Sequence, residues 1–262
     1  MDPRLPEGSC VILTGPTVLP DGGILDNAPM KLSAALLALL AAAPLTWAQT
    51  ATPSSTTPAG IPLDAPWKQA VFKFATEKLQ HSAWGVSHSE RDYLLAARLA
   101  TESKLEIDTD VLFAAAFLHD VGAFDAWRKD GVDHTDRAAE VAPEILVAAG
   151  FPSAKVPAAQ DAMRNHMYYR TDAKGAEAIV LHDADTLDFL GNIGIARILS
   201  LTTRHRWATD LATAVKTLEG FNKDLPPRLL TLAAKPIATA RVAESKAFLD
   251  SLKAETEDGK AP

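Results

Sequence analysis

The chain has 262 residues, of which 47% are hydrophobic and 23% charged, and its formal net charge is −7. One Cys excludes a disulfide scaffold, and 33 acidic against 26 basic residues exclude a basic surface for a nucleic-acid polymer. Because aromatic residues make up only 6%, we expect a helical core built from Leu, Ala, Ile and Val.

The first 66 residues are predicted to lie outside the fold. Residues 1–29 carry Pro or Gly every few positions, which favours a mis-assigned start or a disordered leader. Residues 30–48 are typical of a signal peptide, with Lys31 before an apolar run and the small Ala48 at its end; the alternative is a buried helix. The Ser/Thr/Pro-rich residues 49–66 are predicted to be a linker. We therefore expect a secreted or periplasmic protein whose mature chain has no stable membrane span.

From Trp67 onward the apolar residues recur at helical spacing, and no run has a period of two. This pattern predicts one all-α domain over residues 67–255, followed by a tail at 256–262. One helix is expected to begin at His88. The others are expected to span Val111–Asp120, Asp133–Gly150, Lys155–Tyr169, Ala173–Leu190, Gly194–Thr202, Ala208–Asn222 and Pro227–Lys253.

Histidine and aspartate occur at the ends of these helices. His119 and Asp120 end the apolar segment VLFAAAFLHD, where two adjacent polar side chains need water or a partner. A metal ion held between helices would be such a partner. Imidazole and carboxylate ligands suit Mn, Fe, Co, Ni, Zn or Mg, whereas a structural zinc finger would need thiolates.

The order of these residues resembles the HD superfamily of metal-dependent phosphohydrolases. The segments LHDVGAF and DADTLDFLGNIGIAR carry the resemblance, which covers about residues 80–203. It implies an all-helical HD-domain bundle, a divalent cation, and hydrolysis of a phosphate ester or anhydride. His88, His119, Asp120 and Asp185 match the family's four metal ligands. Asp183 competes for the last place, but the family pattern A-D-x-L selects Asp185.

Two further histidines leave the number of ions open. Members of the family with two metals carry two extra His residues between the HD pair and the last Asp, and His134 and His166 occupy that interval. We expect one ion, with a second at His134 and His166 as the alternative. Otherwise His134 is a surface residue beside the helix-capping Asp133, and His166 supports the metal ligands without binding the ion itself.

Asp120 and Arg91 are the candidate catalytic residues. Arg91 lies one helical turn after His88, so it could clamp a phosphate, or else form a surface ion pair. Asp188 lies one turn after Asp185 and is expected to orient a metal ligand. Four residues after the HD pair form a loop that could cover the substrate or merely connect two helices: Phe124, Trp127, Arg128 and Lys129. The remaining histidines, His81, His182 and His205, are expected to be structural.

The predicted reaction is attack on phosphorus by a water that a divalent metal has made more acidic. The substrate would be a small phosphorylated anion such as a nucleotide. The sequence lacks a Walker loop, a dinucleotide-binding turn and a G-x-S-x-G elbow, which excludes ATP-driven, NAD-linked and serine-hydrolase functions. Two alternatives remain: an HD-fold di-iron oxygenase acting on a small organic substrate, and a secreted helical binding module with a structural metal.

Overall fold

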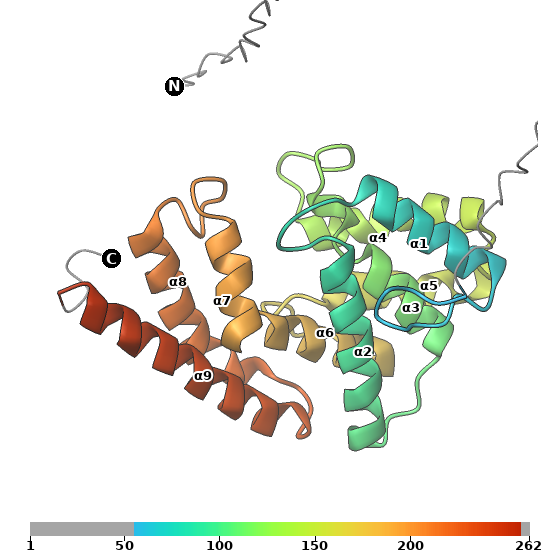
Figure 1. Ribbon diagram of the computed structural model, residues 1–262. Coiled ribbons are helices and arrows are strands. Elements are labelled where there is room, and N and C mark those ends of the chain that lie inside the picture. Colours follow the sequence, from blue (N-terminus) through green and yellow to red (C-terminus); the bar gives the residue numbers. More distant parts are fainter. Residues whose placement is uncertain (1–54, 258–262) are drawn as a thin grey trace, which may run out of the picture. The chain divides into compact units, whose positions relative to one another are not determined.

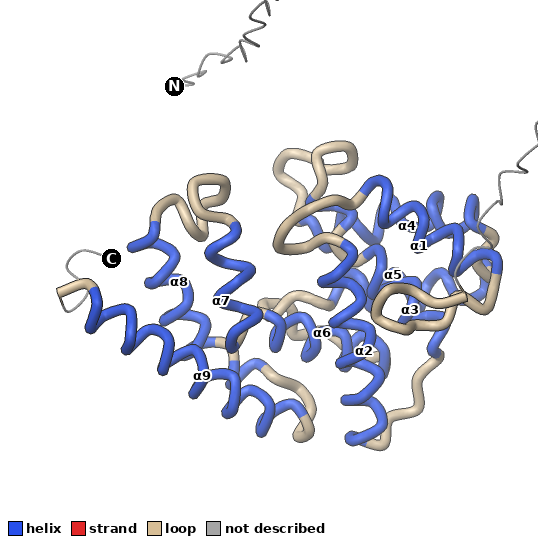
Figure 2. The backbone as a smooth tube through the Cα atoms, viewed as in Figure 1, coloured by secondary structure: helices blue, strands red, loops and turns tan. Residues whose placement is uncertain are grey.

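The computed structural model describes residues 55–257, and within this range all regular secondary structure is helical (Figures 1 and 2). This confirms the predicted all-α class. The helices are α1 (Pro66–Lys78), α2 (Val86–Ser103), α3 (Thr109–Leu118), α4 (His134–Ala149), α5 (Val156–Asn165), α6 (Ala176–Asp188), α7 (Gly191–Ser200), α8 (Leu211–Asp224) and α9 (Ala234–Glu255), with short 3₁₀ turns at Val121–Ala123, Ser153–Lys155 and Pro226–Arg228.

The leader and the signal peptide that the sequence predicts lie outside the described residues. The described part of the expected linker differs from the prediction, because Ile61 and Leu63 are buried in the core and Ala59 N–H donates to Glu90 Oε1 at 2.9 Å. Packing against α2 thus orders a Pro-rich segment that has no periodicity of its own. Among the helices of residues 55–257, none has both the length and the apolar character needed to cross a bilayer.

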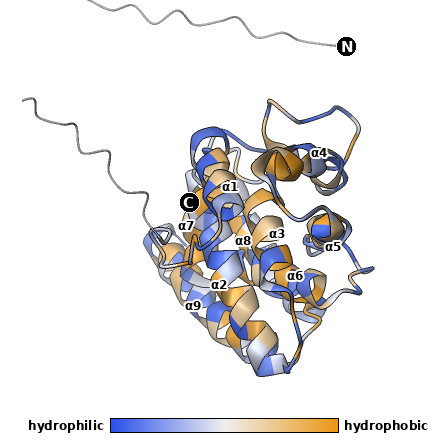
Figure 3. Ribbon diagram, turned by 90° about the vertical axis from the view of Figure 1, so that its right-hand side faces the viewer, coloured by the Kyte–Doolittle hydropathy of each residue, from blue (hydrophilic) through white to orange (hydrophobic). Residues whose placement is uncertain are grey.

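Helix α3 forms the centre of the core. Every residue from Val111 to Leu118 is buried, which requires neighbours on all sides, and α1, α2, α5 and α6 supply them. Asp108 caps the helix by accepting hydrogen bonds from the N–H groups of Asp110 and Val111. In α9, by contrast, hydrophilic and hydrophobic residues alternate along the ribbon (Figure 3). The apolar character of α3 therefore fixes where its C-terminal end, and with it His119, lies within the fold.

Helices α7, α8 and α9 pack together around a second apolar cluster that includes Ile198, Leu218 and Leu249 (Figure 1). The chain reverses sharply between α6 and α7, where two glycines lie. Gly191 has a φ of 69°, and a Cβ on Gly194 would lie 2.1 Å from the Phe189 carbonyl oxygen. This reversal brings α7, and with it Arg197, back toward α6.

The last helix begins later than the sequence predicts. Instead of one helix over Pro227–Lys253, a 3₁₀ turn and an extended Leu229 precede α9. Asp183 on α6 accepts hydrogen bonds from Leu230 N–H, Thr231 N–H and the Thr231 hydroxyl at 2.7–2.8 Å. These bonds to α6 replace the helical hydrogen bonds that the segment would otherwise make.

Candidate metal centre

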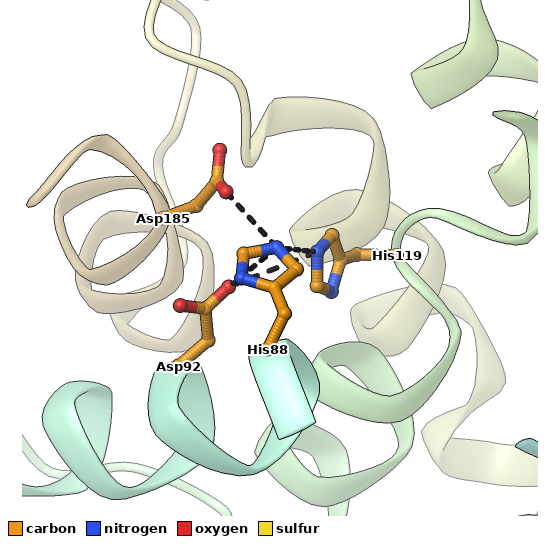
Figure 4. A group of neighbouring side chains, drawn as sticks. All are labelled: His88, Asp92, His119 and Asp185. Carbon is orange, nitrogen blue, oxygen red and sulfur yellow. Dashed lines mark hydrogen bonds and ion pairs between the residues drawn. The ribbon is translucent and has the colours of Figure 1, made fainter. Parts of the chain in front are cut away.

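Three helices bring the four predicted ligands to one place. His88 lies in the first turn of α2, His119 follows the last turn of α3, and Asp185 lies on α6 (Figure 4). Asp120 is the residue after His119. The side chains of His88, His119 and Asp185 are almost completely buried, and Asp120 is 14% exposed. Asp92, one turn after His88 on the same face of α2, joins them.

The donor atoms of this cluster have separations that suit a common cation. His88 Nε2 lies 3.1 Å from His119 Nε2, 3.3 Å from Asp185 Oδ1 and 3.6 Å from Asp120 Oδ2. His119 Nε2 lies 3.3 Å from Asp120 Oδ2. Atoms that are each about 2.1 Å from one ion lie roughly 3 to 4.3 Å from one another. His88, Asp92, His119 and Asp185 each offer a donor atom within 4.8 Å of the others, whereas Asp120 groups with His119 and His166, so this buried His/Asp cluster could hold a metal ion.

The other ring nitrogens already have partners. His88 Nδ1 donates to Asp188 Oδ2 at 2.8 Å, and His119 Nδ1 donates to the Ala116 carbonyl oxygen at 2.8 Å. Since each Nδ1 carries the donated proton, the Nε2 lone pairs of both rings face each other. Two lone pairs at 3.1 Å repel unless a proton or a cation lies between them, and this fixed tautomer is the one that a metal ligand needs.

Asp120 connects this cluster to the two further histidines. While its Oδ2 faces His88 and His119, its Oδ1 lies 3.5 Å from His134 Nε2 and 3.6 Å from His166 Nε2. His166 is fully buried, its Nδ1 donates to the Met163 carbonyl at 2.6 Å, and its Nε2 has no hydrogen-bond partner. The structure thus places both candidate second-site histidines beside the outer oxygen of Asp120.

Asp188 supports the cluster, as predicted. Besides accepting from His88, it accepts from Arg91 Nε at 3.0 Å, Arg91 Nη2 at 2.8 Å and Arg197 Nη1 at 3.1 Å. The phosphate clamp predicted for Arg91 is therefore corrected, because both edges of its guanidinium are bonded to Asp188 and to the Ser87 carbonyl. Arg91 is a positioning residue that acts on His88 through Asp188.

The charges of the cluster shift the pKa values of its members. Burial and Arg197 lower the pKa of His88, but Asp92, Asp120 and Asp185 outweigh them and raise it well above its usual value. Burial raises the pKa of Asp188, but His88, Arg197 and Arg91 hold it well below its usual range. Burial lowers the pKa of His166, which favours its neutral form. In the metal-free protein a proton therefore competes with a cation for His88.

This arrangement agrees with the comparison with known families, in which residues 85–190 match the model of the HD domain. The chain contains an HD domain. A solved structure from Lactobacillus plantarum has 25% sequence identity and a TM-score of 0.53, over 72% of this chain and 96% of its own. An HD-superfamily hydrolase from Bacillus thuringiensis has 20% identity and a TM-score of 0.50, over 72% and 95%. No match is found among curated proteins.

Bacillus subtilis YpgQ has the same fold. Its structure in complex with ADP has 20% identity to this chain and a TM-score of 0.55, over 72% of this chain and 97% of that one. The described chain thus has the fold of HD-superfamily hydrolases, and within that fold it has a buried His/Asp cluster that could hold a metal.

A cavity of about 840 Å³ opens beside the His/Asp cluster, and Asp120, His134 and Asp185 form part of its wall. The loop after the HD pair lines it, as predicted for Phe124, Arg128 and Lys129; Trp127 instead packs on Phe74. A second loop, between α7 and α8, supplies Arg204, His205, Arg206 and Trp207. Basic and aromatic side chains line the cavity together with two carboxylates of the cluster, Asp120 and Asp185.

The remaining histidines and Asp183 are not members of the His/Asp cluster. His81 stacks on Trp84 at 3.5 Å and accepts hydrogen bonds from two backbone N–H groups, and His205 accepts from Trp207 N–H. Both also line the cavity, which their sequence context did not indicate. His182 is buried with its Nδ1 3.1 Å from Asp183 Oδ1, and Asp183 bonds the loop before α9.

Sequence reasoning missed three features of this HD domain. Asp92 could have been found from its i, i+4 spacing to His88, because such residues share one helix face. Arg197 contacts Asp188 only because the chain reverses at Gly191, so the sequence gives no spacing signal for it. The loop with Arg204 and Arg206 lies beyond residue 190, where the family match ends.

Proposed function

We propose that this protein hydrolyses a phosphate ester or anhydride with a divalent cation bound by His88, His119, Asp120 and Asp185. The observation that carries the proposal is the pair of Nε2 atoms 3.1 Å apart, with both Nδ1 atoms committed as donors. A cation bound there would supply an acidified water at neutral pH and would offset charge on the phosphoryl oxygens.

The side chains of the chain itself would prepare this reaction. Asp188 and Ala116 hold the two rings in the ligand tautomer. Asp120 is the cluster member that is both partly exposed and part of the cavity wall, so substrate and water would meet the site there. Burial raises the pKa of Asp120, but His119, His166 and His88 lower it well below its usual value, so this carboxylate stays ionised and able to accept a hydrogen bond.

The cavity supports an anionic substrate. Arg128, Lys129, Arg204 and Arg206 are exposed at its wall, and within residues 55–257 only Arg128 of these four has an acidic partner, Asp125 at 3.6 Å. Asp125 and Asp130 also line the cavity, so the basic residues form a local site rather than a uniformly positive surface. Guanidinium groups match phosphate oxygens in geometry and charge.

A di-iron oxygenase is the second candidate, and the position of Asp120 between two histidine pairs favours it. A carboxylate with one oxygen toward His88 and His119 and the other toward His134 and His166 has the placement that a bridging ligand needs. A structural metal in a binding module is disfavoured, because structural sites are closed whereas Asp120 and Asp185 reach the cavity.

Metal analysis followed by a substrate panel tests the proposal. Purified protein is loaded separately with Mn²⁺, Mg²⁺, Co²⁺, Ni²⁺, Zn²⁺ and Fe²⁺ and assayed on phosphomonoesters, pyrophosphate and nucleoside phosphates. The YpgQ complex with ADP is a reason to include nucleotides, although at 20% identity that likeness extends to the fold alone. Release of phosphate or pyrophosphate that depends on the metal supports the proposal; two irons, O₂ consumption and no phosphoester cleavage would refute it.

We further propose export of the protein to the periplasm or the cell exterior. The proposal rests on the sequence of residues 30–48, with its Lys31 start and apolar run. N-terminal sequencing of protein from the producing cell is expected to find Gln49 or a neighbour as the first residue. A chain that retains residues 1–29 would contradict the export proposal.

A further inference from the structure

Asp92 is a buried carboxylate that the ligand set proposed above does not use. Its exposed fraction is 0%, and neither of its oxygens has a hydrogen-bond partner. Three other buried acids of this fold are satisfied: Asp183 by Leu230 and Thr231, Asp188 by His88 and two arginines, and Glu90 by Ala59 N–H. Asp185, a proposed ligand, resembles Asp92 in that its Oδ2 has no hydrogen-bond partner among the described residues. A buried charge without donors is costly unless a cation compensates it, so Asp92 needs an explanation.

The geometry around Asp92 provides one. Asp92 follows His88 by four residues, which places both side chains on the same face of α2. Asp92 Oδ2 lies 3.2 Å from His88 Nε2 and 3.7 Å from His119 Nε2, the two atoms that face each other at the centre of the cluster (Figure 4). One donor atom from each of Asp92, His88, His119 and Asp185 lies within 4.8 Å of the others.

The charged groups around Asp92 also indicate a cation between the two imidazoles. Asp188 pairs with both Arg91 and Arg197, and Arg197 Nη2 also lies 3.4 Å from His88 Nε2, while Asp92, Asp120 and Asp185 face the two imidazoles. Because both Nδ1 atoms are donors and the Nε2 atoms are 3.1 Å apart, the rings have room for a single proton between them. A divalent cation at that point would offset the negative charge that these carboxylates bring to the cluster.

We infer that Asp92 is a fifth protein ligand of the cation, in addition to His88, His119, Asp120 and Asp185. This inference rests on the proposed metal site and extends it. Two imidazoles and three carboxylates exceed the four donors of a tetrahedral zinc site and suit ions that accept five or six ligands, many of them oxygen, such as Mn²⁺. Asp92 thus shifts the preference of the site from Zn²⁺ toward Mn²⁺.

The test compares Asp92→Asn with a matched variant, Glu90→Gln, in the full chain. Glu90 is a buried acid on the same helix, about 200° around its axis from Asp92, and Gln can still accept from Ala59 N–H. Mn²⁺ and Zn²⁺ dissociation constants are measured by calorimetry, the Co²⁺ absorption spectrum reports the ligand set, and thermal unfolding of the metal-free proteins reports the fold.

We expect Asp92→Asn to weaken Mn²⁺ binding by at least about tenfold, the lower end of the loss seen when even an outer supporting group is removed. Zn²⁺ binding should weaken less, the Co²⁺ spectrum should change, and the metal-free variant should unfold at or above the wild-type temperature because an uncompensated buried charge is gone. Glu90→Gln should leave both dissociation constants and the Co²⁺ spectrum unchanged.

Wild-type affinity and an unchanged Co²⁺ spectrum in Asp92→Asn would overturn the inference while leaving the four-ligand site intact. Weaker Mn²⁺ binding with an unchanged Co²⁺ spectrum would also overturn it, because Asp92 would then only position His88. Wild-type protein that binds neither Mn²⁺ nor Co²⁺ would instead refute the proposed metal site as a whole.

Discussion

His88 and His119 direct their Nε2 atoms at each other across 3.1 Å, although the two residues come from different helices. Neither ring can turn away, because each Nδ1 is hydrogen-bonded, one to Asp188 and the other to the Ala116 carbonyl. The site is therefore preorganised by its own supporting hydrogen bonds.

The first prediction concerns the ligands from α3. His119→Ala should abolish binding of the divalent cation and activity while the helical fold persists, because it removes one imidazole and leaves His88 without its opposite donor. Metal content after dialysis and the circular dichroism spectrum measure the two effects. His205→Ala, which alters a histidine of the cavity wall only, should keep its metal. A full complement of metal in His119→Ala would show that the site is elsewhere.

The second prediction concerns the number of ions. The double variant His134→Ala/His166→Ala should retain one ion and part of the hydrolytic activity, since His88, His119, Asp120 and Asp185 remain. Metal-to-protein ratios of wild type and variant decide the question. A fall from two ions to one would assign a second site to these histidines, and complete loss of metal would contradict the proposed ligand set.

The third prediction concerns the support of His88. Asp188→Asn should weaken binding of Mn²⁺ by about tenfold or more, because the charge that fixes the tautomer of His88 and pairs with Arg91 and Arg197 is lost. Arg91→Lys should have a smaller effect, since Arg197 still contacts Asp188. Calorimetric titration with Mn²⁺ measures both. Equal affinities in wild type and Asp188→Asn would mean that Asp188 serves the fold alone.

The fourth prediction concerns the cavity. Arg204→Gln/Arg206→Gln should raise the KM for a phosphorylated substrate by roughly tenfold or more, the effect of losing hydrogen bonds to a charged group, with unchanged metal affinity. Lys246→Gln is the control, because this exposed lysine of α9 does not line the cavity. Steady-state kinetics on the best substrate of the panel measures the change. An unaltered KM would exclude these arginines from substrate binding.

The fifth prediction concerns stability and pH. Asp108→Ala should lower the free energy of unfolding by about 1 kcal/mol at pH 6, because α3 loses its N-cap. Burial raises the pKa of Asp108, but Lys155 and the N–H groups of Asp110 and Val111 lower it below its ordinary value. Its contribution is therefore complete above the unfolded pKa and is lost as the pH falls through the lower folded value.

Urea unfolding at several pH values measures this difference. The gap between wild type and Asp108→Ala should shrink below about pH 4. Asp108→Asn, which keeps a capping oxygen without the charge, should show a smaller gap that is less dependent on pH. A gap that is constant down to pH 2 would rule out the carboxylate as its source.

The sequence predicted the helical class from local signals, and its resemblance to the HD superfamily pointed to His88, His119, Asp120 and Asp185, which the structure brings close together. The apolar run Val111–Leu118 indicates a buried helix, and adjacent His and Asp at its end indicate a ligand pair. The role of Arg91 could not be predicted, because its partner Asp188 is 97 residues away and competes with any phosphate for the guanidinium. The late start of α9 depends on Asp183 in the same way.

The hydrogen bonds between Asp183 and Thr231 set a limit on how this protein can be shortened. The match to the HD family ends at residue 190, yet Asp183 lies inside that match and accepts three hydrogen bonds from residues 230 and 231. A truncation at residue 203 would remove these three donors from a buried carboxylate two positions before Asp185 and leave it with His182 Nδ1. The folded unit therefore extends beyond the end of the family match. A fragment designed to keep the proposed metal site has to include α9 and the loop before it.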